Sequence, residues 1–138
     1  MTDQEPAALP QGGYLPEVLG VEWIPSKPGT VRARMAVSRR HMAPNNYLHA
    51  ASVIALADSA CGVGCMRARP EGAISFTTIE LKSNFLGTAK EGEVIACAAK
   101  MVHGGRTTQV WDAEVVNETT GKPCALFRCT QLLIYPRP

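Results

Sequence analysis

One carboxylate stands alone in the most apolar stretch of this chain. Residues 49–61 read HAASVIALADSAC, and Asp58 is the only acidic or basic side chain in the run apart from His49. In a helix its neighbours three and four places away are Ile54, Ala55, Cys61 and Gly62. None of them can pair with a carboxylate, and burying an unpaired carboxylate is costly. Asp58 therefore faces a cleft or contacts a partner from another part of the protein, which makes it a candidate for chemistry. The alternative is a buried carboxylate with a purely structural hydrogen bond.

The elements around Asp58 follow from hydrophobic periodicity. Residues 49–67 predict one long helix that is apolar nearly all round, as in a helix buried on every side, and Pro70 and Gly72 end it. Before it, residues 29–38 alternate as a half-buried strand, and residues 39–48 form a loop with one Pro and two Asn. Residues 14–21 predict a short helical turn that Gly20 ends.

Four further strands are predicted after the helix, over residues 77–86, 93–102, 106–116 and 123–135. In the first of them strict alternation places Ile79, Leu81 and Phe85 on one face and Thr78 on the other. Short turns between consecutive strands predict an antiparallel meander. A helix without a polar stripe cannot bury all of its apolar faces against a flat sheet. The sheet must therefore curl round the helix, or a second subunit must cover its remaining face.

The composition fits one compact domain. The chain has 138 residues, of which 46% are hydrophobic and 19% charged, and a net charge of +2 that gives no reason to expect a nucleic-acid partner. Residues 1–12 are polar and contain Pro, which predicts a disordered lead before a domain over residues 13–138 and argues against a secretion signal. Asp58 interrupts the longest apolar run. We therefore expect a cytoplasmic protein that binds no membrane.

The five cysteines predict packing rather than disulfides or a metal site. An odd number at irregular spacing, without a secretion signal, is typical of reduced thiols. Cys61 and Cys65 share a helix face, but no second pair of Cys or His ligands accompanies them. No metal is expected.

The order of elements and three groups of residues resemble the hotdog-fold acyl-CoA thioesterases. The likeness is greatest to the phenylacetate-pathway (PaaI-like) group of the 4-hydroxybenzoyl-CoA thioesterase superfamily. There a loop ends in His-Gly-Gly and an acidic residue follows nine places after the His; here these are His49-Ala50-Ala51 and Asp58. Thr77 and Thr78 stand where the family has Ser or Thr, and residues 104–107 where it has a hairpin near CoA. The resemblance covers roughly residues 15–135 and departs from the family at both alanines and at Ala43, where many relatives have Asn.

The resemblance implies an α+β hotdog fold, with one central helix wrapped by a curled antiparallel sheet of five to six strands. It also implies hydrolysis of an acyl-CoA thioester to free acid and CoA, with Asp58 as general base or nucleophile. The N–H of Ala50 at the helix start would bind the oxyanion, where the helix dipole favours negative charge. Since roughly 13 Å of helix separates the two, the family arrangement draws them from different subunits of a homodimer, or of a dimer of dimers. Thr78, or else Thr77, would orient the water or the carboxylate.

Further roles stay open between binding and structure. Residues expected near CoA or the acyl group are Asn46, Leu48, Ala51, Gly105, Arg106 and Thr107. His49 is either part of the site or a residue that caps or packs the helix entry, and Asn46 fits a left-handed turn position. An acyl tunnel between subunits would be lined by Leu48, Ile54 and Cys61. No cofactor is expected beyond the CoA of the substrate.

Three alternatives to a thioesterase remain. One is an enoyl-CoA hydratase of the same fold, although those enzymes typically carry an Asp and a His close together. The second is a non-catalytic acyl-CoA-binding protein. The third is a structural subunit that lost activity when Ala50 and Ala51 replaced the Gly pair.

Overall fold

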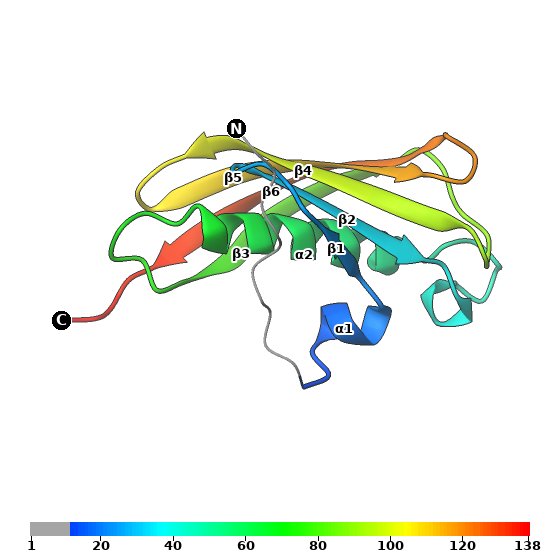
Figure 1. Cartoon of the computed structure of the whole chain (residues 1–138), viewed down its shortest axis with the longest axis horizontal. Helices are drawn as coiled ribbons and strands as arrows, with labels where there is room; N and C mark the ends of the chain where they lie inside the picture. Colours follow the sequence, from blue (N-terminus) through cyan, green and yellow to red (C-terminus); the bar gives the residue numbers. More distant parts are fainter. Residues whose placement is uncertain (1–11) are drawn as a thin grey trace.

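The chain folds into one antiparallel sheet with one long helix along its side (Figure 1). The structure, a computed structural model, describes residues 12–138, so the disordered lead predicted for residues 1–12 lies outside it except for its last residue. The elements in chain order are α1 (Leu15–Leu19), β1 (Glu22–Ile24), β2 (Thr30–Ala36), η1 (Arg39–His41), α2 (Ala50–Arg67), β3 (Ser75–Phe85), β4 (Val94–Gly104), β5 (Thr108–Asn117) and β6 (Pro123–Ile134). The predicted α+β class with one long helix is confirmed.

The strand order differs from a simple meander. It runs β1-β2-β4-β5-β6-β3, and every neighbouring pair is antiparallel. The meander is correct for β4, β5 and β6, but the prediction is wrong for β3, which pairs with β6 at the far edge. The physical reason lies in burial: β4 and β5 bury many of their residues and suit the centre, whereas β3 is mostly exposed and suits an edge. The three-residue strand β1 was not predicted.

Two glycines let aromatic rings pack directly against α2. A Cβ on Gly64 would lie 2.3 Å from the ring of Trp111, and one on Gly62 would lie 2.8 Å from the ring of Phe76. Contacts that short do not occur in close-packed interiors, so both positions need glycine. By length and composition α2 could cross a membrane, but 56% of it is buried inside this fold, as in the core helix of a globular domain.

A bulge in β3 decides which of its side chains face α2. The register shifts between Thr78, which pairs with Gln131, and Glu80, which pairs with Thr130. Residues paired across two strands share a face of the sheet, so Thr78 lies with Gln131 on the side of α2. Strict alternation predicts the opposite face for Thr78, and this is wrong because the extra residue Ile79 breaks the period.

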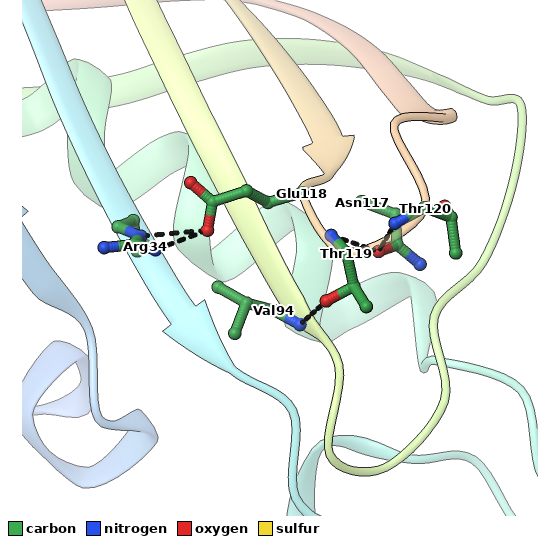
Figure 2. A network of polar contacts seen from close by, with 6 residues as sticks. All are labelled: Arg34, Val94, Asn117, Glu118, Thr119 and Thr120. Carbon is green, nitrogen blue, oxygen red and sulfur yellow. Dashed lines mark hydrogen bonds and ion pairs between the residues drawn. The ribbon is translucent and has the colours of Figure 1, made fainter.

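The turn between β5 and β6 is held by Asn117, as Figure 2 shows. Its Oδ1 accepts hydrogen bonds from the N–H groups of Thr119 and Thr120, at 3.0 and 3.2 Å. Its Nδ2 donates to the carbonyl oxygen of Thr88, whose hydroxyl in turn accepts from the N–H of Leu48 at 3.0 Å. The turn is thereby connected to the loop that leads into α2.

Candidate active site

Asp58 lies half-buried in the middle of α2 and has one protein hydrogen-bond partner there. The hydroxyl oxygen of Thr78 on β3 lies 2.8 Å from Asp58 Oδ1. The same hydroxyl lies 2.8 Å from Oε1 of Gln131 on β6. Within residues 12–138 no Lys or Arg forms an ion pair with Asp58, and no donor reaches its Oδ2. The carboxylate is therefore held at one oxygen and open at the other.

An apolar cavity of about 250 Å³ opens beside Asp58. Its walls come from α1, β1, α2 and β3, and its lining residues are Pro16, Trp23, Asp58, Ser59, Gly62, Val63, Met66 and Phe76. Asp58 is the one ionisable group among these described residues. No local sequence pattern predicts this lining, because four separate elements build it. Leu48 and Cys61, expected to line an acyl tunnel, are instead buried in the core.

A larger hollow of about 720 Å³ lies over β2, β4 and β5 and contains no residue of the candidate site. Its charged lining residues are Lys27, Arg32, Lys100, Asp112 and Glu114. Asp112 is already occupied by a two-bond ion pair with Arg128. The smaller cavity, which holds the half-buried carboxylate, is therefore the candidate site.

The start of α2 leaves one amide unused. His49 is the N-cap residue, and its Nδ1 accepts a hydrogen bond of 2.9 Å from the N–H of Ala51. Its carbonyl oxygen accepts from Ser52 and Val53. For the N–H of Ala50 the described part of the chain supplies no acceptor. This amide and the helix dipole together favour a negative charge at this position.

The loop before α2 is shaped by its two asparagines. Asn46 has a φ of 68°, in the left-handed region that Asn tolerates, and its N–H bonds to the carbonyl of Ala43. The side chain of Asn45 accepts from the N–H of Tyr47 at 3.3 Å. Both residues are exposed and act locally as turn residues.

The remaining predicted residues do not gather around Asp58 within one chain. Thr77 is exposed and pairs with Leu132, on the face of the sheet opposite to Thr78. Gly105, Arg106 and Thr107 form the β4–β5 hairpin, near the C-terminal end of α2 in Figure 1.

Arg106 at that hairpin contacts the C-terminal segment. Its guanidinium lies 6.0 Å from the centre of the Tyr135 ring, and the Tyr135 hydroxyl donates to its carbonyl oxygen. The structure thus brings Asp58 and Thr78 together, and it separates them from the helix start and from the hairpin.

Comparison with known proteins gives the class. The family model of the thioesterase superfamily matches residues 45–124, which include the helix start, Asp58 and Thr78. The chain is 30% identical over 116 residues to the 1,4-dihydroxy-2-naphthoyl-CoA hydrolase of Listeria monocytogenes, covering 84% of this chain and 92% of that protein. It is 27% identical over 125 residues to the acyl-coenzyme A thioesterase PaaI of Escherichia coli, covering 91% of this chain and 86% of the relative.

The solved structures agree with this result. The Escherichia coli PaaI structure matches with a TM-score of 0.78 at 25% sequence identity, covering 86% of this chain and 83% of that one. The chain therefore belongs to the thioesterase superfamily, and it is a thioester hydrolase. Within that class its fold and its relatives are those of the PaaI-like hotdog thioesterases.

Proposed function

We propose that this protein hydrolyses acyl-CoA thioesters to the free acid and CoA, with Asp58 as the reacting carboxylate. The observation that carries the proposal is the pairing of Asp58 with Thr78 beside an apolar cavity, in a chain of the thioesterase superfamily. Two relatives are named for the hydrolysis of CoA esters, which supports CoA as the thiol part of the substrate. No cofactor enters the reaction beyond the CoA of the substrate.

Asp58 can act in either of two ways. As a general base it removes a proton from water while the water oxygen adds to the thioester carbonyl carbon. As a nucleophile its own oxygen adds, the C–S bond breaks, and water then hydrolyses the resulting anhydride. In both routes the carbonyl electrons move to an oxyanion and return as CoA leaves as the thiol. Thr78 holds Oδ1, and Oδ2 is the oxygen that we propose to react.

The oxyanion donor we propose is the N–H of Ala50. It precedes Asp58 by eight residues of α2, a rise of about 12 Å, so one carbonyl group cannot contact both in the same chain. We therefore infer a homodimer in which Ala50 of one subunit faces Asp58 of the other. Exposed apolar side chains along and just after the edge strand β3 support this assembly: Ile79, Leu81, Phe85 and Leu86. Pairs of such dimers would form the tetramer.

Contacts to CoA would also cross the dimer. Asn46 and Ala51 lie at the start of α2, whereas the hairpin of Gly105, Arg106 and Thr107 lies near its other end. We propose that one CoA molecule meets these two groups from different subunits. Arg106 is exposed and would bind a phosphate through its guanidinium.

The cavity beside Asp58 would receive the acyl group. A cavity of about 150 Å³ can hold a benzene ring, so the volume of about 250 Å³ here admits an aryl or a short branched acyl group. The rings of Trp23 and Phe76 give it apolar walls suited to stacking.

The test is thiol release from a panel of aryl, short-chain and long-chain acyl-CoAs. Asp58→Asn should lose at least about a hundredfold in kcat, since it removes the reacting group. Glu80→Gln is the matched control, because Glu80 is an exposed carboxylate just past the bulge of β3 and pairs on the opposite face. Full activity in Asp58→Asn would overturn the mechanism. Binding of acyl-CoA without hydrolysis by the wild type would instead favour the binding-protein alternative.

A further inference from the structure

Two buried glutamines lie next to each other on the face of the sheet that packs against α2. Gln131 of β6 pairs with Thr78 on one side and with Gln109 of β5 on the other. Gln131 is 0% exposed and Gln109 is 1% exposed. A buried amide is costly unless it is hydrogen-bonded, so the partners of each show what it does. Gln109 donates to the carbonyl oxygen of Ala68 at 3.1 Å and accepts from the Trp111 indole at 2.8 Å.

Gln131 has different partners, and they lead to the reacting carboxylate. Its Oε1 lies 2.8 Å from the hydroxyl oxygen of Thr78, which itself lies 2.8 Å from Asp58 Oδ1. Its Nε2 lies 3.4 Å from the sulfur of Cys129. A threonine hydroxyl carries a single proton, so Thr78 cannot donate to both neighbouring oxygens. One of the two contacts must be a hydrogen bond that Thr78 accepts.

The proton on Asp58 decides which contact that is. When Asp58 is ionised, Thr78 donates to it and accepts from the nitrogen of Gln131, whose amide oxygen then faces Cys129. When Asp58 is protonated, it donates to Thr78, Thr78 donates to the oxygen of Gln131, and the amide nitrogen faces Cys129. The amide oxygen and nitrogen are close to equal in size, so both orientations fit the same space.

Cys129 can serve both orientations because a thiol donates and accepts. Its thiol also shares a hydrogen bond with the Cys61 thiol, and this hydrogen bond together with burial raises the pKa of Cys61. Among the described residues of one chain, the ionisable groups beside Asp58 are Cys61, one turn further along α2, and behind it Cys129. The other elements around the carboxylate contribute uncharged side chains, those of Pro16, Trp23 and Phe76.

We propose that Gln131 is a positioning residue for hydrolysis. Its buried amide holds Thr78, and the amide oxygen and nitrogen exchange positions when the protonation state of Asp58 changes. When Asp58 is ionised, the Gln131 amide nitrogen donates to the Thr78 oxygen, so that Thr78 donates its own proton to the carboxylate. The proposal rests on the assignment of Asp58 as the reacting carboxylate. It adds a residue that touches neither substrate nor Asp58 and acts through Thr78.

The kinetic test compares Gln131→Leu with Gln109→Leu, the matched control on the neighbouring strand. Gln131→Leu should lower kcat about tenfold, in line with a weakened bond to a charged group, and leave KM within about twofold. The acidic limb of its pH–rate profile should move to higher pH, since the ionised carboxylate is stabilised less. Gln131→Glu should lower kcat more than Gln131→Leu does, because the new carboxylate accepts the hydrogen bond that Thr78 otherwise donates to Asp58. Gln109→Leu should lose stability but keep the wild-type acidic limb.

A second readout does not depend on turnover. In NMR spectra of the wild type, the side-chain amide signals of Gln131 should shift with pH over the range in which Asp58 titrates. The shift should be absent in Asp58→Asn. The proposal would be overturned if the Gln131 signals of the wild type did not change with pH. It would also be overturned if folded Gln131→Leu kept the acidic limb of the wild-type pH–rate profile. If the wild type hydrolyses no thioester, the proposed function fails and the NMR titration still decides the role of Gln131.

Discussion

The hydroxyl of Thr78 and the carboxylate of Asp58 lie 2.8 Å apart, and a bulge in β3 makes this contact possible. Without the register shift after Thr78, the strand period that points Leu81 and Phe85 toward α2 would turn Thr78 to the opposite face. The neighbouring Thr77 pairs with Leu132 and is exposed there. Of the two threonines that the sequence offers, the geometry selects Thr78.

Thr78→Val should lower kcat by about one to two orders of magnitude, because it removes the hydrogen bond that orients a charged group and keeps the side-chain shape. Thr77→Val is the control and should retain the wild-type rate. Steady-state thiol release on one acyl-CoA measures both. A greater loss in Thr77→Val than in Thr78→Val would mean that the carboxylate is oriented from the other face.

Met66→Ala should enlarge the cavity beside Asp58 and shift the acyl preference. Met66 is part of the lining, so its truncation should raise kcat/KM for acyl groups a few carbons longer by about tenfold relative to the aryl ester. Met101→Ala is the control, since Met101 packs on the core outside this cavity. An unchanged ratio of kcat/KM values in Met66→Ala would place the acyl group elsewhere.

His49→Ala should destabilise the fold by about 1 kcal/mol, the usual cost of a lost helix cap. The N–H of Ala51 loses its 2.9 Å bond to the imidazole, and the amide of Ala50 next to it is held less firmly. His49→Asn should restore most of the stability and the activity, because Asn caps helices well. Urea denaturation and thiol release check the two effects. Restored stability without restored activity would assign His49 a direct part in catalysis.

Stability should fall in acid through two carboxylates, Glu93 just before β4 and Asp112 on β5. The N–H of Lys90 and the side chain of Asn117 donate to Glu93 and hold its pKa below the ordinary 4.5. The Arg128 guanidinium lowers the pKa of Asp112 below 3.8 in the same manner. Below those ordinary values the unfolded chain binds more protons than the folded one. The stabilisation is therefore complete above about pH 5 and is lost as the pH falls through the lowered folded-state values.

Urea denaturation between pH 3 and 6 measures this dependence, as a free energy of unfolding at each pH. Glu93→Gln should flatten the acid slope. Glu91→Gln, at an exposed position in the same connection, should leave it unchanged. An equal slope in wild type and Glu93→Gln would show that the two hydrogen bonds do not persist in solution.

The sequence predicts those features that depend on local pattern. The long helix, the isolated Asp58 and the alternation of Trp111, Ala113 and Val115 on β5 are all observed. The partner of β3 was missed because pairing across the sheet is not local. The bulge was missed because nothing in the alternation marks the extra residue.

Gln131 was missed although its sequence carries a signal. It is the one polar residue in the buried series Phe127, Cys129, Gln131 and Leu133 of β6, and such a residue needs a buried partner. The cavity carried no comparable signal. Trp23 of β1 and Phe76 of β3 are far apart in the chain, and only the folded arrangement brings them to Asp58.

The strand that holds Thr78 toward α2 is also an edge strand of the sheet, with Ile79 54% exposed at the bulge. If the proposed dimer forms along this edge, dilution acts on the chemistry as well as on the assembly. Specific activity should then decline as the protein concentration falls below the dissociation constant of the dimer, with a lag when concentrated enzyme is diluted into substrate. A substitution at Ile79 that weakens the dimer would lower the specific activity at low enzyme concentration, as an active-site defect does. That loss of activity would disappear at high enzyme concentration.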